Sequence, residues 1–116
     1  MGSILVRVAD YQVLADVGIN ADEANRTQPL IVSTEVQLDR SDVSQITETV
    51  DYRKIVAEIE QLSQCHIPLI ETFAGKLARN CLQLPFARHV KVEIDKPFAL
   101  TRGLAGVVVE MSKDDI

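Results

Sequence analysis

The chain has 116 residues and a mass of 12.8 kDa, with 47% hydrophobic residues, 25% charged residues and a net charge of −5. This length and composition predict one globular domain spanning residues 1–116. The acidic balance and the lack of a Lys/Arg-rich run argue against a nucleic-acid or anionic-membrane partner. The longest apolar run, residues 104–109, falls well short of the roughly 18 residues that a membrane span requires.

The cysteines and histidines are too few and too scattered for a disulfide framework or a zinc site. Cys65 and Cys81 are the two cysteines, and no basic start followed by a signal-type apolar core precedes them. We therefore expect free thiols and a cytoplasmic protein. His66 and His89 lack the spacing of zinc ligands, and no glycine-rich phosphate loop is present. The sequence thus predicts no metal and no other cofactor.

Alternating apolar and polar residues predict two strands in the first third of the chain. The first covers residues 4–8 and continues through 11–18 after a bulge or turn at residues 9–10. Residues 20–23 resemble a capped turn. The clearest strand covers residues 30–38, where apolar side chains occupy one face.

Two amphipathic helices are predicted in the middle of the chain, after a polar loop over residues 43–50. Asp51 is a plausible N-cap for a helix over residues 52–64, whose apolar residues recur at helical spacing. A second helix is predicted to begin near Pro68, since proline suits a first helical turn, and to be closed by Pro85.

The last third predicts two further strands, over residues 90–94 and 103–111, separated by a loop over 95–102. The complete order is β-β-α-α-β-β. It predicts an α+β fold with a four-stranded antiparallel sheet and both helices on one face. The opposite face is polar and must meet water, because it carries Arg7, Ser33, Glu35, Gln37, Lys91, Glu93 and Glu110. Two bare sheet edges favour pairing between subunits, which could close several sheets into a ring.

Four residues have the chemistry of a site, although each also has an ordinary structural role. Glu71 suits the first turn of a helix, and its carboxylate could anchor a ligand through paired hydrogen bonds. Lys96 precedes Pro97 at a turn, where lysines are commonly solvated. Tyr52 opens a helix and could pack its ring with a wet hydroxyl, and Glu23 lies in the capped turn. None of the four identifies a function alone.

Together with their neighbours these residues form four short motifs in a fixed order. They read GINADE at 18–23, followed by Gln28, then TVDY at 49–52, LIET at 69–72 and VEIDKP at 92–97. Over residues 4–111 the chain resembles the dihydroneopterin aldolase family. The resemblance implies the tunnelling fold, in which four subunits close a barrel and two barrels stack into an octamer. It also implies active sites that lie between subunits.

The resemblance further implies an activity and a role for each residue. The family cleaves the pterin 7,8-dihydroneopterin into 6-hydroxymethyl-7,8-dihydropterin and glycolaldehyde, with neither metal nor Schiff base. By similarity, Glu71 would bind the aminopyrimidine edge of the ring, and Lys96 would be the main acid/base. Tyr52 would relay a proton and Glu23 would help to shape the site. The backbone around Ile70 and Val50, together with Asp51, would complete substrate binding.

The chain also departs from the family pattern. Val17 and Thr27 stand where many members have histidine and glycine, and residues 100–103 replace a proline-rich turn. These departures leave two alternatives open besides the aldolase. One is dihydroneopterin triphosphate epimerase, in which the same bond breaks and re-forms from the other face. The other is a non-catalytic pterin-binding member of the fold. Pro97 favours the aldolase.

Overall fold

The computed structural model of the protein describes residues 2–19 and 27–115. The turn predicted at 20–23, and with it Glu23, lies outside the described residues. The elements are β1 (Leu5–Ala15), β2 (Gln28–Leu38), the 3₁₀ helix η2 (Ile46–Glu48), α1 (Tyr52–Ser63), α2 (Ile70–Leu82), β3 (Ala87–Lys96), β4 (Ala105–Ser112) and the 3₁₀ helix η3 (Lys113–Asp115).

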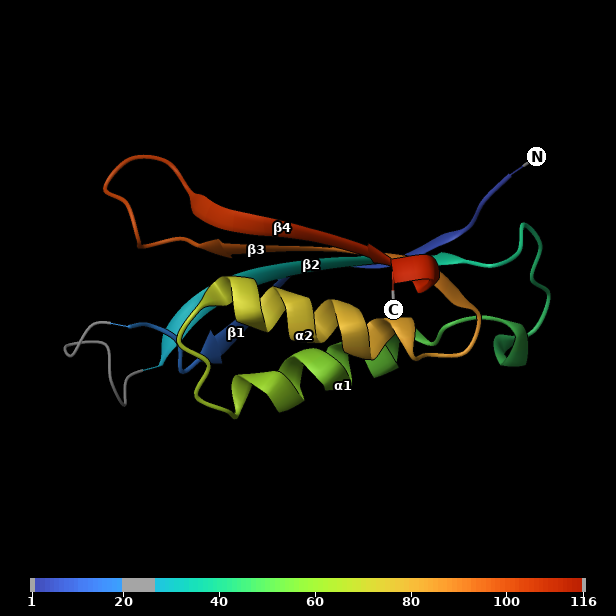
Figure 1. The fold of residues 1–116 in the computed structure, drawn as a ribbon, viewed down its shortest axis with the longest axis horizontal. Helices are drawn as coiled ribbons and strands as arrows, with labels where there is room; N and C mark the ends of the chain where they lie inside the picture. Colours follow the sequence, from blue (N-terminus) through green and yellow to red (C-terminus); the bar gives the residue numbers. More distant parts are fainter. Residues whose placement is uncertain (1, 20–26, 116) are drawn as a thin grey trace.

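The four strands form one antiparallel sheet in the order β1-β2-β3-β4, and both helices cover the same face (Figure 1). α1 packs on β1, while α2 packs on β3 and β4. The predicted α+β architecture and element order are therefore confirmed. β1 and β4 are the outer strands of this sheet.

The core lies between the sheet and the two helices. β2 buries every second residue along its length, as strand alternation predicts. The largest buried side chains of the helices are Phe73, Ile55, Ile59, Leu77 and Leu82. Cys81 belongs to this core, and burial raises the pKa of its thiol to about 12. A thiol in that environment stays neutral and serves as a small apolar side chain.

The bulge predicted in the first strand is present. The β1–β2 register shifts between Val8 and Tyr11, and Asp10 has a positive φ of 55°. The Asp10 N–H donates to the Ser33 hydroxyl at 2.9 Å, which satisfies a donor that the bulge removes from the ladder. Beyond the bulge, the Tyr11 hydroxyl donates to the Glu60 carboxylate on α1, and this hydrogen bond raises the pKa of Tyr11.

Several predicted boundaries were wrong. α2 begins at Ile70 rather than near Pro68, because the Phe73 N–H bonds to the Leu69 carbonyl, which makes Leu69 the N-cap. β3 extends through Lys96 where a loop was predicted, since Lys96 pairs with Ala105 on β4. The predicted fourth strand correspondingly begins two residues later, at Ala105. The loop over 43–50 contains the short helix η2.

Candidate functional site

An open pocket of about 550 Å³ lies where α2 begins and β3 gives way to the β3–β4 connection. This is the end of the molecule that carries the β3–β4 connection in Figure 1. Among its lining residues are Gln28, Leu69, Ile70, Glu71, Lys96 and Phe98. The structure thus brings three of the predicted site residues, Ile70, Glu71 and Lys96, to one pocket. We call this the α2-end pocket.

Glu71 reaches the α2-end pocket because it lies in the first turn of α2. The first N–H groups of a helix have no partner within the helix, and their partial positive charge favours a nearby carboxylate. Glu71 is exposed and Ile70 is half-buried. The carboxylate is therefore accessible to a ligand while the neighbouring side chain anchors the helix start.

Backbone hydrogen bonds between distant segments build the wall of this pocket. The Gly18 N–H donates to the Pro68 carbonyl at 2.9 Å, and the Ile67 N–H donates to the Asp16 carbonyl at 3.0 Å. Gly18 has a φ of 129°, a conformation that favours glycine. The Gln28 side-chain amide adds a bond of 2.8 Å to the Val17 carbonyl. These bonds hold the chain that follows β1 against the connection between α1 and α2.

Lys96 is positioned by the last residues of the β3–β4 ladder, where the strands approach closely. A Cβ atom at Gly106 would lie 2.4 Å from the Ile94 carbonyl oxygen and 2.2 Å from an Asp95 carboxylate oxygen. Both distances are shorter than any real carbon–oxygen contact, so this position requires glycine. Gly106 was not among the residues predicted to shape the site. The available signal was a glycine directly before three valines and within the predicted strand over residues 103–111, because an isolated glycine in a strand pattern is typical of close backbone approach.

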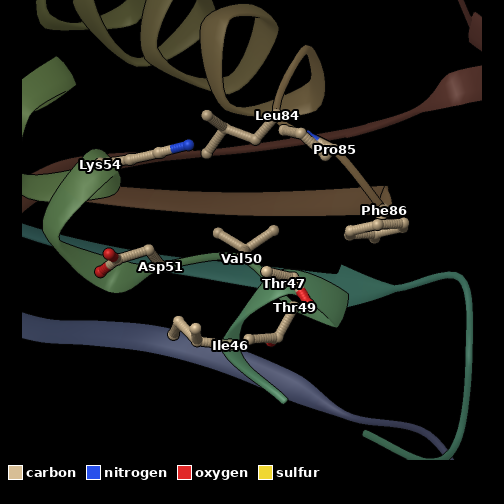
Figure 2. A pocket seen from close by; sticks show the side chains of 9 residues that line it. All are labelled: Ile46, Thr47, Thr49, Val50, Asp51, Lys54, Leu84, Pro85 and Phe86. Carbon is tan, nitrogen blue, oxygen red and sulfur yellow. The ribbon is translucent and has the colours of Figure 1, made fainter.

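The remaining described site residues lie elsewhere. Val50 and Asp51 line a second pocket, of about 390 Å³, with Lys54 and the segment 84–86 (Figure 2). Figure 2 shows the Lys54 ammonium directed toward Leu84 and the Asp51 carboxylate directed away from the pocket. Tyr52 opens α1 at this same end and is 62% exposed. We call this the α1-end pocket.

Asp51 is engaged in local structure. As predicted, it caps α1, since its carboxylate accepts from the Arg53 N–H at 2.9 Å. It also accepts from the Arg53 guanidinium at 2.7 to 3.1 Å. These bonds lower the pKa of Asp51 to about 2. The resemblance implies that Asp51 binds substrate, but its carboxylate is already bonded to Arg53 at the helix cap.

The two pockets lie at opposite ends of α2. Glu71 is in its first turn, and Leu84 follows its last residue. A helix of 13 residues is about 20 Å long. One bicyclic ligand cannot reach both pockets of a single chain. The described site residues therefore form two separate groups within one chain.

Neither a metal cluster nor a membrane span is found in the described part of the chain. No group of three or more His, Cys, Asp or Glu residues there is arranged to hold a metal ion. None of the helices there is long and apolar enough to cross a membrane.

The comparison with protein families agrees with this geometry. The profile of the family FolB, dihydroneopterin aldolase, matches residues 6–112. The chain belongs to this family. FolB members are enzymes, and the activities represented among the relatives are an aldolase and an epimerase. The matched region contains both pockets and every described site residue.

The similar proteins include both an epimerase and aldolases. A curated relative from Pseudomonas aeruginosa, a dihydroneopterin triphosphate 2'-epimerase, is 26% identical over 103 residues, which cover 85% of this chain and 84% of the relative. The dihydroneopterin aldolase of E. coli, solved in complex with neopterin, has a TM-score of 0.84 at 20% identity and covers 94% of this chain and 99% of its own. That of Burkholderia thailandensis, bound to guanine, has a TM-score of 0.80 at 22% identity, with 97% and 93% covered. These structures establish the shared fold.

Proposed function

We propose that this protein is a dihydroneopterin aldolase, which cleaves 7,8-dihydroneopterin into 6-hydroxymethyl-7,8-dihydropterin and glycolaldehyde. The observation that carries the proposal is the meeting of Glu71 and Lys96 in the α2-end pocket. A ring anchor and a proton carrier are the two functions that this reaction requires of a protein. The pocket volume of about 550 Å³ lies within the range typical of small-molecule sites.

In the proposed mechanism Glu71 fixes the ring. Its carboxylate accepts paired hydrogen bonds from the aminopyrimidine edge, a geometry that gives both affinity and orientation. The Ile70 backbone, at the start of α2, lies beside it. The rest of the pterin then extends across the pocket toward Lys96.

The reaction needs a proton removed from one place and returned at another. The hydroxyl on the second side-chain carbon loses its proton and becomes the aldehyde of glycolaldehyde. At the same time the bond between the first and second side-chain carbons breaks. The bond electrons pass into the ring imine, and glycolaldehyde leaves. Protonation of the remaining carbon gives the hydroxymethyl product. We assign this proton movement to Lys96, with Tyr52 as relay and Glu23 shaping the site.

The charge of the pocket supports an unphosphorylated substrate. Its described lining has one cation, Lys96, and one anion, Glu71. A triphosphate is usually bound by several cationic side chains.

A second function, the 2'-epimerase reaction, is favoured by the curated Pseudomonas relative. It uses the same cleavage, followed by re-addition of the aldehyde from the other face.

The separation of the two pockets supports a site built by two copies of the chain. We propose a homo-oligomeric ring of four subunits, and two stacked rings in the octamer, in which one copy supplies Glu71 and Lys96. The neighbouring copy would supply Val50, Asp51 and Tyr52. The 62% exposure of Tyr52 in the single chain leaves its side chain available for such a contact. We expect the assembly to act in the cytoplasm.

The direct test is incubation with 7,8-dihydroneopterin and, separately, with its triphosphate, followed by product separation. We expect glycolaldehyde and the hydroxymethyl pterin from the first substrate. A 2'-epimer of the triphosphate as the main product would establish the epimerase instead. Pterin binding without turnover of either substrate would establish the non-catalytic alternative.

Mixing two impaired variants tests the shared site. Lys96→Ala and Tyr52→Phe should each be impaired, but a co-expressed mixture contains sites with both residues intact. If the two variants assemble at random, about a quarter of all sites should have both residues intact, because each site takes one half from each of two neighbouring copies. No recovery in a mixed oligomer would show that both residues act within one chain. Tyr52→Phe alone should also alter the ratio of cleavage to epimerisation.

A further inference from the structure

One pair of side chains joins the connection between α1 and α2 to the residue that follows β1. The His66 Nδ1 atom lies 2.9 Å from a carboxylate oxygen of Asp16, and the two residues are 50 positions apart in the sequence. A carboxylate only accepts hydrogen bonds, so the ring carries its proton on Nδ1 and donates it. Neither side chain is assigned to ring binding or to proton transfer. The pair therefore requires an explanation of its own.

Backbone hydrogen bonds lie directly beside this pair. The Ile67 N–H donates to the Asp16 carbonyl at 3.0 Å, and the Gly18 N–H donates to the Pro68 carbonyl at 2.9 Å. On the inner side, the Val17 and Ile67 side chains are buried in the core. We call residues 16–18, residues 66–68 and the bonds between them the 16/66 clamp. The His66–Asp16 pair, with side chains 50% and 27% exposed, closes the clamp on its outer side.

The clamp borders the α2-end pocket. Gly18 and Pro68 belong both to the clamp and to the pocket lining. Glu71 is only three positions beyond Pro68, whereas Lys96 ends β3 on a separate element. A shift of the clamp would therefore move the Glu71 carboxylate relative to the Lys96 ammonium.

The start of α2 depends on such support because it has no side-chain cap. Leu69 occupies the N-cap position, and an aliphatic side chain cannot accept a hydrogen bond from the first turn. α1 differs, since the Asp51 carboxylate caps it. The first N–H groups of a helix have no partner within the helix. The clamp thus holds, from outside the helix, the segment that leads into the first turn of α2.

We propose that His66 and Asp16 are positioning residues, which hold the start of α2 so that Glu71 meets the pterin ring at a fixed distance from Lys96. This inference rests on the proposed pterin site and adds to it a contact that does not touch the ligand. The clamp is attached to the segment that carries Glu71 and not to the strand that carries Lys96. Loss of the pair should therefore weaken ring binding more than it slows proton transfer.

A positioning role and a purely structural role predict different kinetics. Exposed pairs of this kind contribute little to the free energy of unfolding, so most chains should stay folded without it. If the pair only stabilised the fold, a smaller folded fraction would lower the apparent kcat and leave KM unchanged. A positioning role predicts instead that the Kd for pterin and KM both rise while kcat changes little.

Reversing one charge tests the pair. His66→Glu places a second carboxylate against Asp16 and should raise the Kd for the hydroxymethyl pterin product by about tenfold, measured by isothermal titration. His66→Ala removes the hydrogen bond without repulsion, and the expected rise is about threefold. Asp16→Lys alone should also be impaired. Combined with His66→Glu it restores opposite charges, and the Kd should return to within about twofold of the wild-type value.

Asn80→Asp is the matched control. The Asn80 amide donates to Glu58 on α1 at 3.1 Å, so this change also creates two facing carboxylates. Asn80 lies nine residues beyond Glu71 on α2, about 14 Å away along the helix, and lines neither the α2-end nor the α1-end pocket. We expect the wild-type Kd. Circular dichroism would confirm folding, and sedimentation velocity would compare the assemblies.

The outcomes separate this inference from the proposed activity. An unchanged Kd in folded His66→Glu, or no recovery in the double variant, would overturn the positioning role. If His66→Glu does not fold, the threefold rise expected in His66→Ala decides the question. A wild-type chain that binds no pterin would overturn the pterin site and the positioning role together. Pterin binding with the expected losses, but without cleavage of dihydroneopterin, would overturn the aldolase activity and leave the positioning role intact.

Discussion

The two ends of the molecule are built in different ways. The α2-end pocket combines the chain after β1, the start of β2, the start of α2 and the β3–β4 connection. The α1-end pocket is formed mainly by one continuous segment, residues 46–54, closed by residues 84–86 (Figure 2). The first depends on contacts between distant segments, whereas the second depends mainly on local capping and turn geometry. Sensitivity to packing should therefore be concentrated at the α2 end.

The largest expected effect comes from Lys96→Ala at the α2 end. Turnover should fall by about 100- to 10,000-fold, the typical contribution of general acid–base catalysis. Affinity for the pterin product should be largely retained, because ring recognition is assigned to Glu71. Steady-state kinetics and product titration would measure the two effects. Lys76→Ala, exposed on α2, is the matched control, and undiminished cleavage by Lys96→Ala would refute the mechanism.

Glu71→Ala should weaken pterin binding by about 10- to 100-fold, since it leaves the ligand's donors without an acceptor. Isothermal titration with a pterin product would measure the loss. Asp42, an exposed loop carboxylate, provides the matched control. Glu60 is unsuitable as a control because it accepts the Tyr11 hydrogen bond. Equal affinity in wild type and Glu71→Ala would remove the anchor role.

Gly106→Ala should destabilise the fold by about 1–3 kcal/mol, because the new methyl group would force β3 and β4 apart beside Lys96. Activity should fall with stability. Gly75→Ala, in α2, is the matched comparison, since a Cβ there meets nothing within 4 Å. That change should stabilise the helix by about 0.5–1 kcal/mol. Urea denaturation would measure the free energy of unfolding of both variants. Equal changes in the two variants would show that β3 and β4 do not approach too closely for a side chain at position 106.

The smallest effect is expected at the α1 end, from the cap of Asp51. Its pKa of about 2 in the folded chain is lower than its ordinary value of 3.8. The ionised carboxylate therefore contributes stability that is complete above about pH 4 and is lost as the pH falls toward 2. In Asp51→Asn the neutral amide keeps a hydrogen-bond acceptor but does not titrate. The difference in the free energy of unfolding between wild type and variant, measured in urea, should shrink as the pH falls from 5 to about 2. A difference that stays constant over this range would show that titration of the Asp51 carboxylate does not affect stability.

The elements and their layers could be predicted from the amino-acid sequence alone. Strand alternation in β2, the helical spacing in α1 and the Asp51 cap are local patterns, so they were predicted correctly, as was the bulge at residues 9–10. The motifs also singled out Glu71 and Lys96, and the structure brings both residues to one pocket. The errors were at boundaries decided by pairing. The Lys96–Ala105 pair extended β3, and the Leu69 cap moved the start of α2.

The distribution of the predicted site residues between two pockets became visible only in the folded chain. A chain pattern does not say which loops meet. The Gly18–Pro68 hydrogen bond joins segments 50 residues apart in the sequence and forms the wall behind Glu71. The need for glycine at position 106 likewise arises from the approach of another strand. The α2 helix, by its length, keeps Glu71 and Lys96 away from Val50 and Asp51, and this rigid spacing is the reason that we propose a site shared between two copies.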